Sequence, residues 1–292
     1  MRICNHDGRL ILIPADHPVT DVPETAVDVE RASGGRFGSD PQGVFSDWAA
    51  FRAWCEESTA EPDVKIDVEK LGPPVPAPRQ IFAIGLNYLA HAVESRMEGA
   101  AVPPTFTKFV SCLTGPYASV TLPSANVDFE VELVVAISRT AHKVAAEDAW
   151  DHVAGLMVGQ DLSERKVQLQ PPVPQFSLGK SYPGFGPTGP WLITPEEVGR
   201  TEDVNNLRIS SAIDGVTMQD DTTAQMILNV ADLIAHLSSI CTLMPGDLIF
   251  TGTPSGVGQA REPQRFLRPG EVLVSTIAGV GQLRTSLVAA EI

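Results

Sequence analysis

The sequence predicts an α+β fold made mostly of β-strands, with a small N-terminal domain joined to a larger β-rich domain. Two observations support this prediction. Short segments rich in Val, Ile and Phe recur along the chain and are separated by Gly and Pro, which is typical of antiparallel β-structure. These segments do not alternate with long amphipathic segments of helical period, so a doubly wound parallel sheet is not expected.

The small N-terminal domain is predicted to cover residues 1–72. It contains an apolar strand at residues 10–13. Further along, Trp48, Phe51 and Trp54 recur at the spacing of a short amphipathic helix. The rest of this region shows no regular period, so we expect it to consist mainly of loops.

A proline-rich linker at residues 73–78 separates the two predicted domains. Its four prolines rule out a helix or a central strand and predict a stiff connector. The C-terminal domain then spans residues 79–292 and opens with a buried strand. Its further strands are predicted at residues 118–123, 127–137, 190–194, 207–213, 247–251, 271–277 and 282–288. Its helices are predicted at about residues 88–97, 146–151 and 223–240.

The chain of 292 residues has a formal net charge of −15. This charge argues against nucleic acid or an anionic membrane surface as a partner, because no basic stripe is present. No segment approaches the roughly 20 apolar residues of a membrane helix, and the first residues lack the apolar core of a signal peptide. The four cysteines are scattered without metal-ligand spacing, which predicts reduced thiols. We therefore expect a cytoplasmic protein.

Glu130 and Glu132 are the most informative pair of residues in the chain. They lie in a Val-rich alternating segment, and side chains at positions i and i+2 of a strand point to the same face. Two carboxylates held that close repel each other, and one takes up a proton unless a cation lies between them. A divalent cation with oxygen ligands resolves the repulsion. A solvated pair on an exposed strand face is the alternative that the spacing leaves open.

Asp161 is a candidate for a third ligand. It follows an apolar run, at a point where a strand would give way to a turn, although a turn or helix-capping residue would fit the same pattern. Arg165 and Gln168 follow at i+4 and i+7 and would share one helical face. Arginine can bind a carboxylate through two hydrogen bonds and glutamine can bind a carbonyl. A solvated helix face is the alternative.

His91 and Glu94 are candidates for a catalytic pair. Asn87 is predicted to cap a helix on which His91 and Glu94 lie at i and i+3. A carboxylate beside an imidazole fixes its tautomer and raises its pKa, which suits a general base that activates water. An ordinary surface ion pair has the same spacing. Because Gly85 precedes this segment and Gly99 follows it, we expect a mobile lid.

Two lysines and a glycine-rich turn could contact an anionic ligand. Lys108 and Lys180 stand in otherwise uncharged segments, and each could hold a substrate oxygen or keep its ammonium in water. Residues 245–258 predict a strand running into a turn whose glycines, including Gly252, expose backbone N–H groups to a carboxylate. The GxGxxG pattern at residues 184–189 is not interpreted as a dinucleotide site, because nearby prolines exclude the required helix start.

The motifs described above, taken in their order along the chain, resemble those of the fumarylacetoacetate hydrolase family from about residue 79 to the C-terminus. Each motif is weak alone, whereas the ordered set is specific. The motifs are Gly85-Leu86-Asn87-Tyr88 with His91 and Glu94, Phe106-x-Lys108, Asp128-Phe129-Glu130-Val131-Glu132-Leu133, Asp161-x-Ser163-x-Arg165-x-x-Gln168, Gly179-Lys180-Ser181, Gly189-Pro190-Trp191, and Gly246-Asp247-Leu248-Ile249-x-Thr251-Gly252-Thr253-Pro254.

The resemblance implies a mixed β-roll fold, a homodimer, and a bound Mg²⁺ or Mn²⁺. It also assigns roles to individual residues. The implied metal ligands are Glu130, Glu132 and Asp161; the implied catalytic residues are His91, Glu94 and Lys180; and the implied substrate contacts are Arg165, Gln168 and Thr253. Lys108 and Gly252 are added as substrate-binding candidates on the grounds given above.

The predicted function is metal-dependent hydrolysis of a C–C bond in a small acylpyruvate-type acid, that is, an anionic 2,4-dioxo acid. Decarboxylation of oxaloacetate and hydration or isomerisation of a 2-oxo-dienoate are the alternatives on the same scaffold. A non-catalytic dimeric binding module is disfavoured, because the candidate metal ligands and His91 are all present. The expected partner is therefore a small 2-oxo acid.

Overall fold

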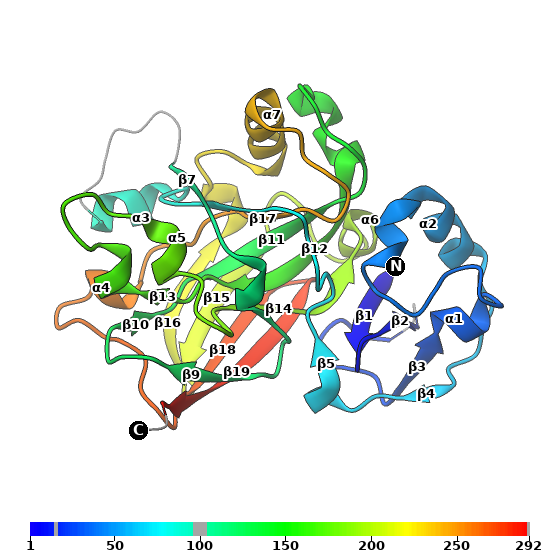
Figure 1. Ribbon diagram of the computed structural model, residues 1–292, viewed down its shortest axis with the longest axis horizontal. Helices are drawn as coiled ribbons and strands as arrows, with labels where there is room; N and C mark the ends of the chain where they lie inside the picture. Colours follow the sequence, from blue (N-terminus) through cyan, green and yellow to red (C-terminus); the bar gives the residue numbers. More distant parts are fainter. Residues whose placement is uncertain (15–16, 96–103, 291–292) are drawn as a thin grey trace.

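The computed structural model describes residues 1–14, 17–95 and 104–290, and two β-sheets form its centre (Figure 1). Within these residues the larger sheet has twelve strands and the smaller sheet has five. Short helices lie around the sheets, and strands predominate. The predicted fold class, α+β with mostly β-structure, is confirmed.

The larger sheet runs through the whole molecule and mixes antiparallel with parallel pairs. Its strands follow the order β4 (Val64–Lys65), β3 (Thr25–Asp28), β2 (Arg9–Ile13), β1 (Arg2–His6), β14 (Gly186–Ile193), β12 (Val153–Gln160), β11 (Val131–Ile137), β17 (Leu248–Phe250), β6 (Ile81–Ile84) and β7 (Thr105–Thr107), with β5 (Leu71–Gly72) on β1 and β8 (Leu113–Thr114) on β14.

The smaller sheet packs against the middle of the larger one, where β19 contacts β14 and β18 contacts β12. Its strands follow the order β16 (Val216–Thr222), β15 (Arg208–Ile213), β18 (Val272–Ile277), β19 (Gly281–Ala289) and β9 (Ser119–Leu122). A separate two-stranded ribbon pairs β10 (Val127–Asp128) with β13 (Ser163–Glu164).

The side chains of β11 alternate between two hydrophobic cores. Leu133 and Val135 belong to the core shared with Ile209 of the smaller sheet. Val134 belongs to the core on the opposite face, which includes Phe51 of α2 (Trp48–Glu57). Because both faces of β11 are covered, its sequence is apolar almost throughout instead of alternating with polar residues.

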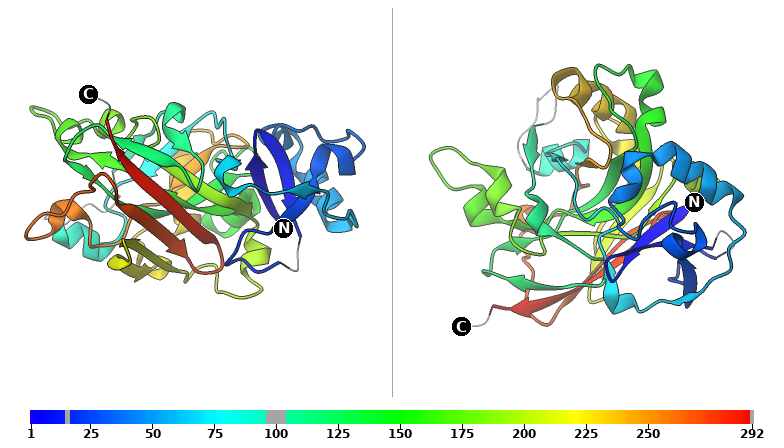
Figure 2. Two further views of the ribbon diagram at one scale, coloured as in Figure 1. Left: turned by 90° about the horizontal axis from the view of Figure 1, so that it is seen from below. Right: turned by 45° about the vertical axis from the view of Figure 1, so that its right-hand side comes forward.

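The helices are short, and those of the N-terminal region are gathered at one end of the molecule (Figures 1 and 2). Among the described residues, none is long and apolar enough to cross a membrane. The α-helices are α1 (Val29–Ala32), α2, α3 (Leu89–Glu94), α4 (Arg165–Gln168), α5 (Phe176–Gly179), α6 (Pro195–Val198) and α7 (Val230–Ile240). The 3₁₀ turns are Gly43–Ser46, Val68–Lys70, Val110–Cys112, Ala146–His152, Thr223–Gln225 and Gly258–Ala260.

Two helix predictions need correction. The segment predicted as one helix over residues 223–240 begins as a 3₁₀ turn, and α7 starts only after Asn229, whose side chain accepts a hydrogen bond from Asp232 N.

Asn87 does not cap α3. It is buried, and its Nδ2 donates to the backbone carbonyls of Leu228 and Thr251 at 2.9 and 2.8 Å. Asn87 therefore joins three loops, which its position before a helix does not reveal.

The predicted lid falls partly outside the described residues. The helix expected over residues 88–97 is present as α3, with Ser95 as its C-cap. The last residues of that prediction, and Gly99, are not among the described ones. The expected mobility of this segment therefore stays a prediction.

The N-terminal strands continue the larger sheet. β1 pairs with β14 in antiparallel register, with Arg2 opposite Ile193. This pairing makes the sheet continuous from residues 1–72 into the main body, and Figure 2 shows the N-terminal elements at one end of the elongated molecule. The division of the chain at residues 73–78 stays a prediction, and the two parts share hydrogen-bonded strands.

Four strand ends of the larger sheet lie side by side at one edge, and the residues next to them form a candidate site. β11 is antiparallel to both β12 and β17, so its first residues lie beside the last residues of those two strands. β6 is parallel to β17 and ends at the same edge. Loops far apart in sequence are thereby placed together, as is usual for functional sites on a rigid sheet.

We predict that Gly159→Ala destabilises the fold. A Cβ at Gly159 would lie 2.4 Å from Val134 Cγ2 and 3.1 Å from Phe250 Cε1, inside a close-packed core. Overpacking of this kind costs about 1–3 kcal/mol. The matched control is Gly38→Ala, because a Cβ at Gly38 meets no atom within 4 Å. Urea unfolding should show a clear loss of stability for the first variant only, and equal stability of both would contradict the packing described.

Candidate active site

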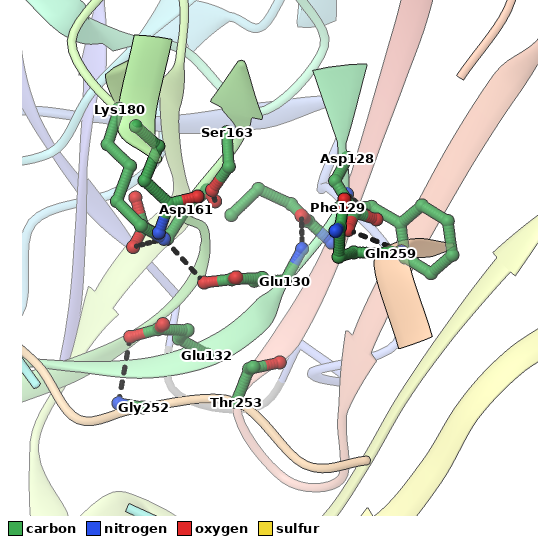
Figure 3. Close-up of polar contacts among 12 residues, drawn as sticks. Asp128, Phe129, Glu130, Glu132, Asp161, Ser163, Lys180, Gly252, Thr253 and Gln259 are labelled. Atoms are coloured by element: carbon green, nitrogen blue, oxygen red, sulfur yellow. Dashed lines mark hydrogen bonds and ion pairs between the residues drawn. The ribbon is translucent and has the colours of Figure 1, made fainter. Parts of the chain in front are cut away.

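Three buried carboxylates meet at this edge of the sheet. Glu130 immediately precedes β11, Glu132 lies within it, and Asp161 follows β12; their exposed fractions are 6%, 1% and 0%. One oxygen of each carboxylate lies within 4.8 Å of one from each of the others. The clustering predicted for these three residues is therefore present, and Figure 3 shows them facing one another.

Two lysines hold the carboxylates from one side. Lys180 Nζ donates to Glu130 Oε2 at 2.7 Å and to Asp161 Oδ2 at 2.6 Å (Figure 3). Lys108 Nζ donates to the other oxygen of Asp161 at 2.7 Å, and it also contacts the backbone carbonyls of Lys180 and Phe185. Both oxygens of Asp161 are thus fixed by ammonium groups, and Lys108 lies beneath the site instead of facing a ligand.

Arg165 holds Glu130 from another side and is itself held by Asp128. Its Nη2 lies 2.7 Å from Glu130 Oε1 and 2.7 Å from Asp128 Oδ2, and its Nη1 donates to Gln168 Oε1 at 2.8 Å. Asp128 is fully buried and also accepts hydrogen bonds from the backbone N–H groups of Gly258 and Gln259. One carboxylate therefore orients both the guanidinium and the following turn.

The carboxyl groups of the cluster differ in pKa, because the neighbouring positive charges lie closer to some of them than to others. Despite its burial, the positive charges of Lys180 and Arg165 lower the pKa of Glu130 to about 2. Burial and the neighbouring carboxylates of Asp161 and Glu130 raise the pKa of Glu132 well above its usual value. Glu132 Oε2 accepts a hydrogen bond from Gly252 N at 2.9 Å, whereas its Oε1 has no partner among the described residues. Of the three, Glu132 is thus the carboxylate that forms no ion pair with a described residue.

This arrangement fits a divalent cation. The carboxylates supply the hard oxygen ligands that Mg²⁺ and Mn²⁺ prefer. Their mutual spacing of up to 4.8 Å is close to twice the metal–oxygen distance of about 2.1 Å, so small movements would let them share one ion. The unpaired oxygen of Glu132 provides a ready ligand. Glu130, Glu132 and Asp161 would hold the ion together.

His91 and Glu94 form a hydrogen-bonded pair on α3. His91 Nδ1 lies 2.6 Å from Glu94 Oε1, and His91 is 6% exposed. The second oxygen of Glu94 accepts a hydrogen bond from Gly256 N at 2.9 Å, which attaches the helix to the loop after β17. With Nδ1 engaged, Nε2 is the nitrogen left to exchange a proton. The predicted pair is therefore assembled and anchored.

A cavity of about 440 Å³ is lined by both residues of the pair and by one member of the carboxylate cluster, Glu130, whereas Glu132 and Asp161 do not line it. Most residues predicted to act on a substrate line it: His91, Glu94, Arg165, Gln168, Lys180 and Thr253. Lys108 and Gly252 do not line it, because Lys108 is directed to Asp161 and the N–H of Gly252 to Glu132. Both therefore support metal-ligand candidates, which argues against the direct substrate contact expected from the sequence.

Two buried glutamines position the backbone between the strands of the site. Gln160 Oε1 accepts from Glu130 N at 2.9 Å, and Gln219 Oε1 accepts from Val131 N at 3.1 Å. Gln219 Nε2 also donates to Thr253 Oγ1 at 2.7 Å. These residues carry no signal in the sequence apart from a polar side chain in an apolar segment.

The chain belongs to the fumarylacetoacetate hydrolase family. The family model for the C-terminal domain of fumarylacetoacetate (FAA) hydrolase matches residues 80–288. A 2,4-didehydro-3-deoxy-L-rhamnonate hydrolase from Sphingomonas sp. (strain SKA58) is 43% identical over 74% of this chain and 75% of the relative. The mitochondrial oxaloacetate tautomerase FAHD2A of Homo sapiens is 39% identical over 74% of this chain and 68% of the relative.

Solved structures share the fold over the full length of the chain. A crystal structure from Mycobacterium smegmatis whose description names HpcE is 46% identical, with a TM-score of 0.92 and coverage of 100% of both chains. Maleylpyruvate hydrolase from Sphingobium sp. SYK-6, in complex with manganese(II) and pyruvate, is 27% identical with a TM-score of 0.79 and the same coverage. The relatives named above include hydrolases and a tautomerase, further structures of the same fold are described as isomerases, and this chain is an enzyme of the same family.

We predict that Glu132→Gln abolishes stabilisation by Mg²⁺ or Mn²⁺. An ion held at 100 times its dissociation constant stabilises the wild type by about 2.7 kcal/mol, so its melting temperature should rise with added metal. The variant lacks a ligand and should show no rise. Without metal it should be no less stable than the wild type, because burial and the carboxylates of Asp161 and Glu130 already disfavour a charge on Glu132.

The exposed Glu56→Gln, which lies on α2, serves as the control and should keep the full response to metal. A Glu132→Gln variant that kept that response would contradict the ligand assignment.

We predict that Asp128→Ala strongly destabilises the protein. The change leaves the Arg165 guanidinium buried without one of its two carboxylates, and breaking such a pair costs about 3–5 kcal/mol. Asp220→Ala is the control, because its ion pair with Arg208 is exposed and should contribute little. Chemical unfolding measures both variants, and an equal, small effect of both would refute the role of Asp128.

Proposed function

We propose that the protein hydrolyses a C–C bond in an acylpyruvate-type acid and that it requires a divalent cation. The observation that carries this proposal is that one cavity is lined both by Glu130 of the carboxylate cluster and by the hydrogen-bonded His91–Glu94 pair. A base anchored within reach of a bound 2-oxo acid is what attack by water requires. The relative named for 2,4-didehydro-3-deoxy-L-rhamnonate hydrolysis supports the reaction class.

The residues of the cavity divide the chemistry between them. When bound, a divalent cation supplies Lewis-acid polarisation of the 2-oxo acid end of the substrate. His91 Nε2 takes a proton from water as the water oxygen attacks the carbonyl remote from that end, and Glu94 stabilises the resulting imidazolium. Breaking of the C–C bond releases a carboxylic acid and leaves the electron pair on a pyruvate enolate. Lys180 Nζ stabilises the enolate oxygen, and the proton held by the His91 imidazolium returns to the enolate carbon, which gives pyruvate and restores the neutral base.

Arg165, Gln168 and Thr253 are the proposed contacts to the substrate, because all three line the cavity. Their positions are fixed by neighbouring groups. Arg165 is held by Asp128, and Thr253 Oγ1 donates to Val131 O at 2.9 Å. Such pre-positioned polar groups reduce the ordering that binding would otherwise require. The same geometry would serve Mg²⁺ or Mn²⁺, and the manganese in maleylpyruvate hydrolase supports testing both.

Isomerisation or decarboxylation of a small 2-oxo acid is the second candidate function. It is favoured by the oxaloacetate tautomerase of Homo sapiens and by a Mycobacterium marinum structure described as 2-hydroxyhepta-2,4-diene-1,7-dioate isomerase. Decarboxylation requires stabilisation of an enolate by the cation and Lys180, without an attacking water. Enolate formation is thus common to both candidates, and the role of His91 separates hydrolysis from decarboxylation.

We predict that His91→Ala reduces turnover of an acylpyruvate by about 10²–10⁴-fold, because general base catalysis typically accelerates a reaction by a factor of this size. Binding of oxalate, which mimics the 2-oxo acid end, should change little, because His91 does not hold that end. Steady-state kinetics and calorimetry with Mg²⁺ measure the two effects. His142→Ala is the control, since this histidine is exposed and lies outside the cavity. Turnover near the wild-type rate in His91→Ala would exclude the hydrolytic role.

A further inference from the structure

We infer that Arg261 forms a second anion-binding subsite, so that the preferred substrate carries a carboxylate at the end of its acyl group. The inference rests on the proposed function for the reacting end of the substrate. It adds the chemistry of the other end, which makes the ligand a dicarboxylic 2-oxo acid.

Three cationic side chains of the described residues line the cavity: Arg165, Lys180 and Arg261. Two of them are already matched by carboxylates. Lys180 bonds Glu130 and Asp161, and Arg165 bonds Asp128 and Glu130. Arg261 is different, because it forms no ion pair with any described residue. Its positive charge is therefore uncompensated on the wall of a concave site.

Backbone carbonyls hold Arg261 in place. Nε donates to Gly256 O at 3.0 Å and Nη2 donates to Met218 O at 2.5 Å, whereas Nη1 has no partner among the described residues. Neutral acceptors orient a guanidinium without cancelling its charge. Such a group can bind a carboxylate with little further loss of side-chain freedom. The neighbouring Glu262 also lines the cavity, but it is exposed and is not paired with Arg261.

The position of Arg261 matches the far end of a substrate. Gly256 contacts both groups: its N–H donates to Glu94 and its carbonyl accepts from Arg261. Arg261 therefore lies on the His91–Glu94 side of the cavity, where the attacked carbonyl and the acyl group beyond it belong. Apolar side chains such as Ile84, Leu86 and Val257 line the wall along with it and suit a hydrocarbon spacer. A terminal carboxylate at the end of that spacer would meet Arg261.

The test compares two acids that differ only at the far end, 2-oxoheptanedioate and 2-oxoheptanoate. Neither has the 2,4-dioxo unit that hydrolysis requires, so binding is measured without turnover. Calorimetry on the Mn²⁺-loaded protein should show the dioate binding about 10- to 100-fold more tightly, the usual effect of a charge-assisted hydrogen bond. Arg261→Met should remove this preference and leave binding of the monoacid unchanged, and Arg261→Lys should keep part of it.

The matched control is Arg208→Met, an exposed arginine outside the cavity, which should alter neither affinity. Equal binding of the two acids by the wild type would overturn the subsite. So would Arg261→Met weakening both acids equally, which is the result expected if Arg261 only supports the loop. A failure of both acids to bind would overturn the subsite as well.

A second arm separates the subsite from the proposed reaction. Its substrates are 2,4-dioxoheptanedioate and 2,4-dioxoheptanoate, which share the cleavable unit and differ in the terminal carboxylate. Cleavage of both with equal kcat/KM would support the hydrolase function and overturn the subsite. Preferential binding of the dioates without cleavage would support the subsite and overturn hydrolysis. If both proposals hold, the dioate is cleaved with the higher kcat/KM and Arg261→Met removes that advantage.

Discussion

The site depends on one electrostatic constraint: four carboxylates, Asp128, Glu130, Glu132 and Asp161, are packed around a buried strand end. Three buried cations accompany them, with Lys108 and Lys180 on Asp161, and Lys180 and Arg165 on Glu130. Counted by formal charge over the described residues, this leaves one negative charge in excess, and Glu132 is the carboxylate that forms no ion pair there. A divalent ion reverses the excess to one positive charge, which an anionic 2-oxo acid can then neutralise. Metal and substrate are thus complementary to the same cluster.

The fold holds the carboxylates together by placing strand ends side by side. It also supplies hydrogen-bond acceptors for the backbone N–H groups of the irregular segments between the strands. Glu130 lies between β10 and β11, outside both ladders, so its N–H needs another acceptor and finds the side chain of Gln160. Gln219 does the same for Val131 and ties it to Thr253. The proposed catalytic pair is tied to a neighbouring loop, because Gly256 N donates to Glu94. The candidate metal ligands, the proposed base and the far wall of the cavity are therefore positioned by hydrogen bonds within adjoining loops.

Much of this arrangement follows from the sequence, and the failures have physical causes. The i and i+2 spacing of Glu130 and Glu132 predicts their clustering, and Val-rich segments predict β11. β12 is expected only as an apolar run before Asp161 and is not given bounds, because Gly155 and Gly159 interrupt its apolar pattern. Both glycines are required there, since a Cβ would lie 2.7 Å from Ile193 O or 2.4 Å from Val134 Cγ2. The contacts of Lys108 and Arg261 depend on which distant segments become neighbours, and no local pattern encodes that.

The central claim is that the buried cluster binds one divalent cation, and a crystal structure grown with Mn²⁺ tests it most directly. The account predicts a single anomalous difference peak per chain at the cluster. Oxygens of Glu130, Glu132 and Asp161 should lie about 2.0–2.2 Å from it, as expected for an ion of this class. Lys180 should remain beside Glu130 and Asp161, available to a substrate oxygen. A structure with these three side chains turned apart, or with manganese bound only elsewhere, would contradict the account.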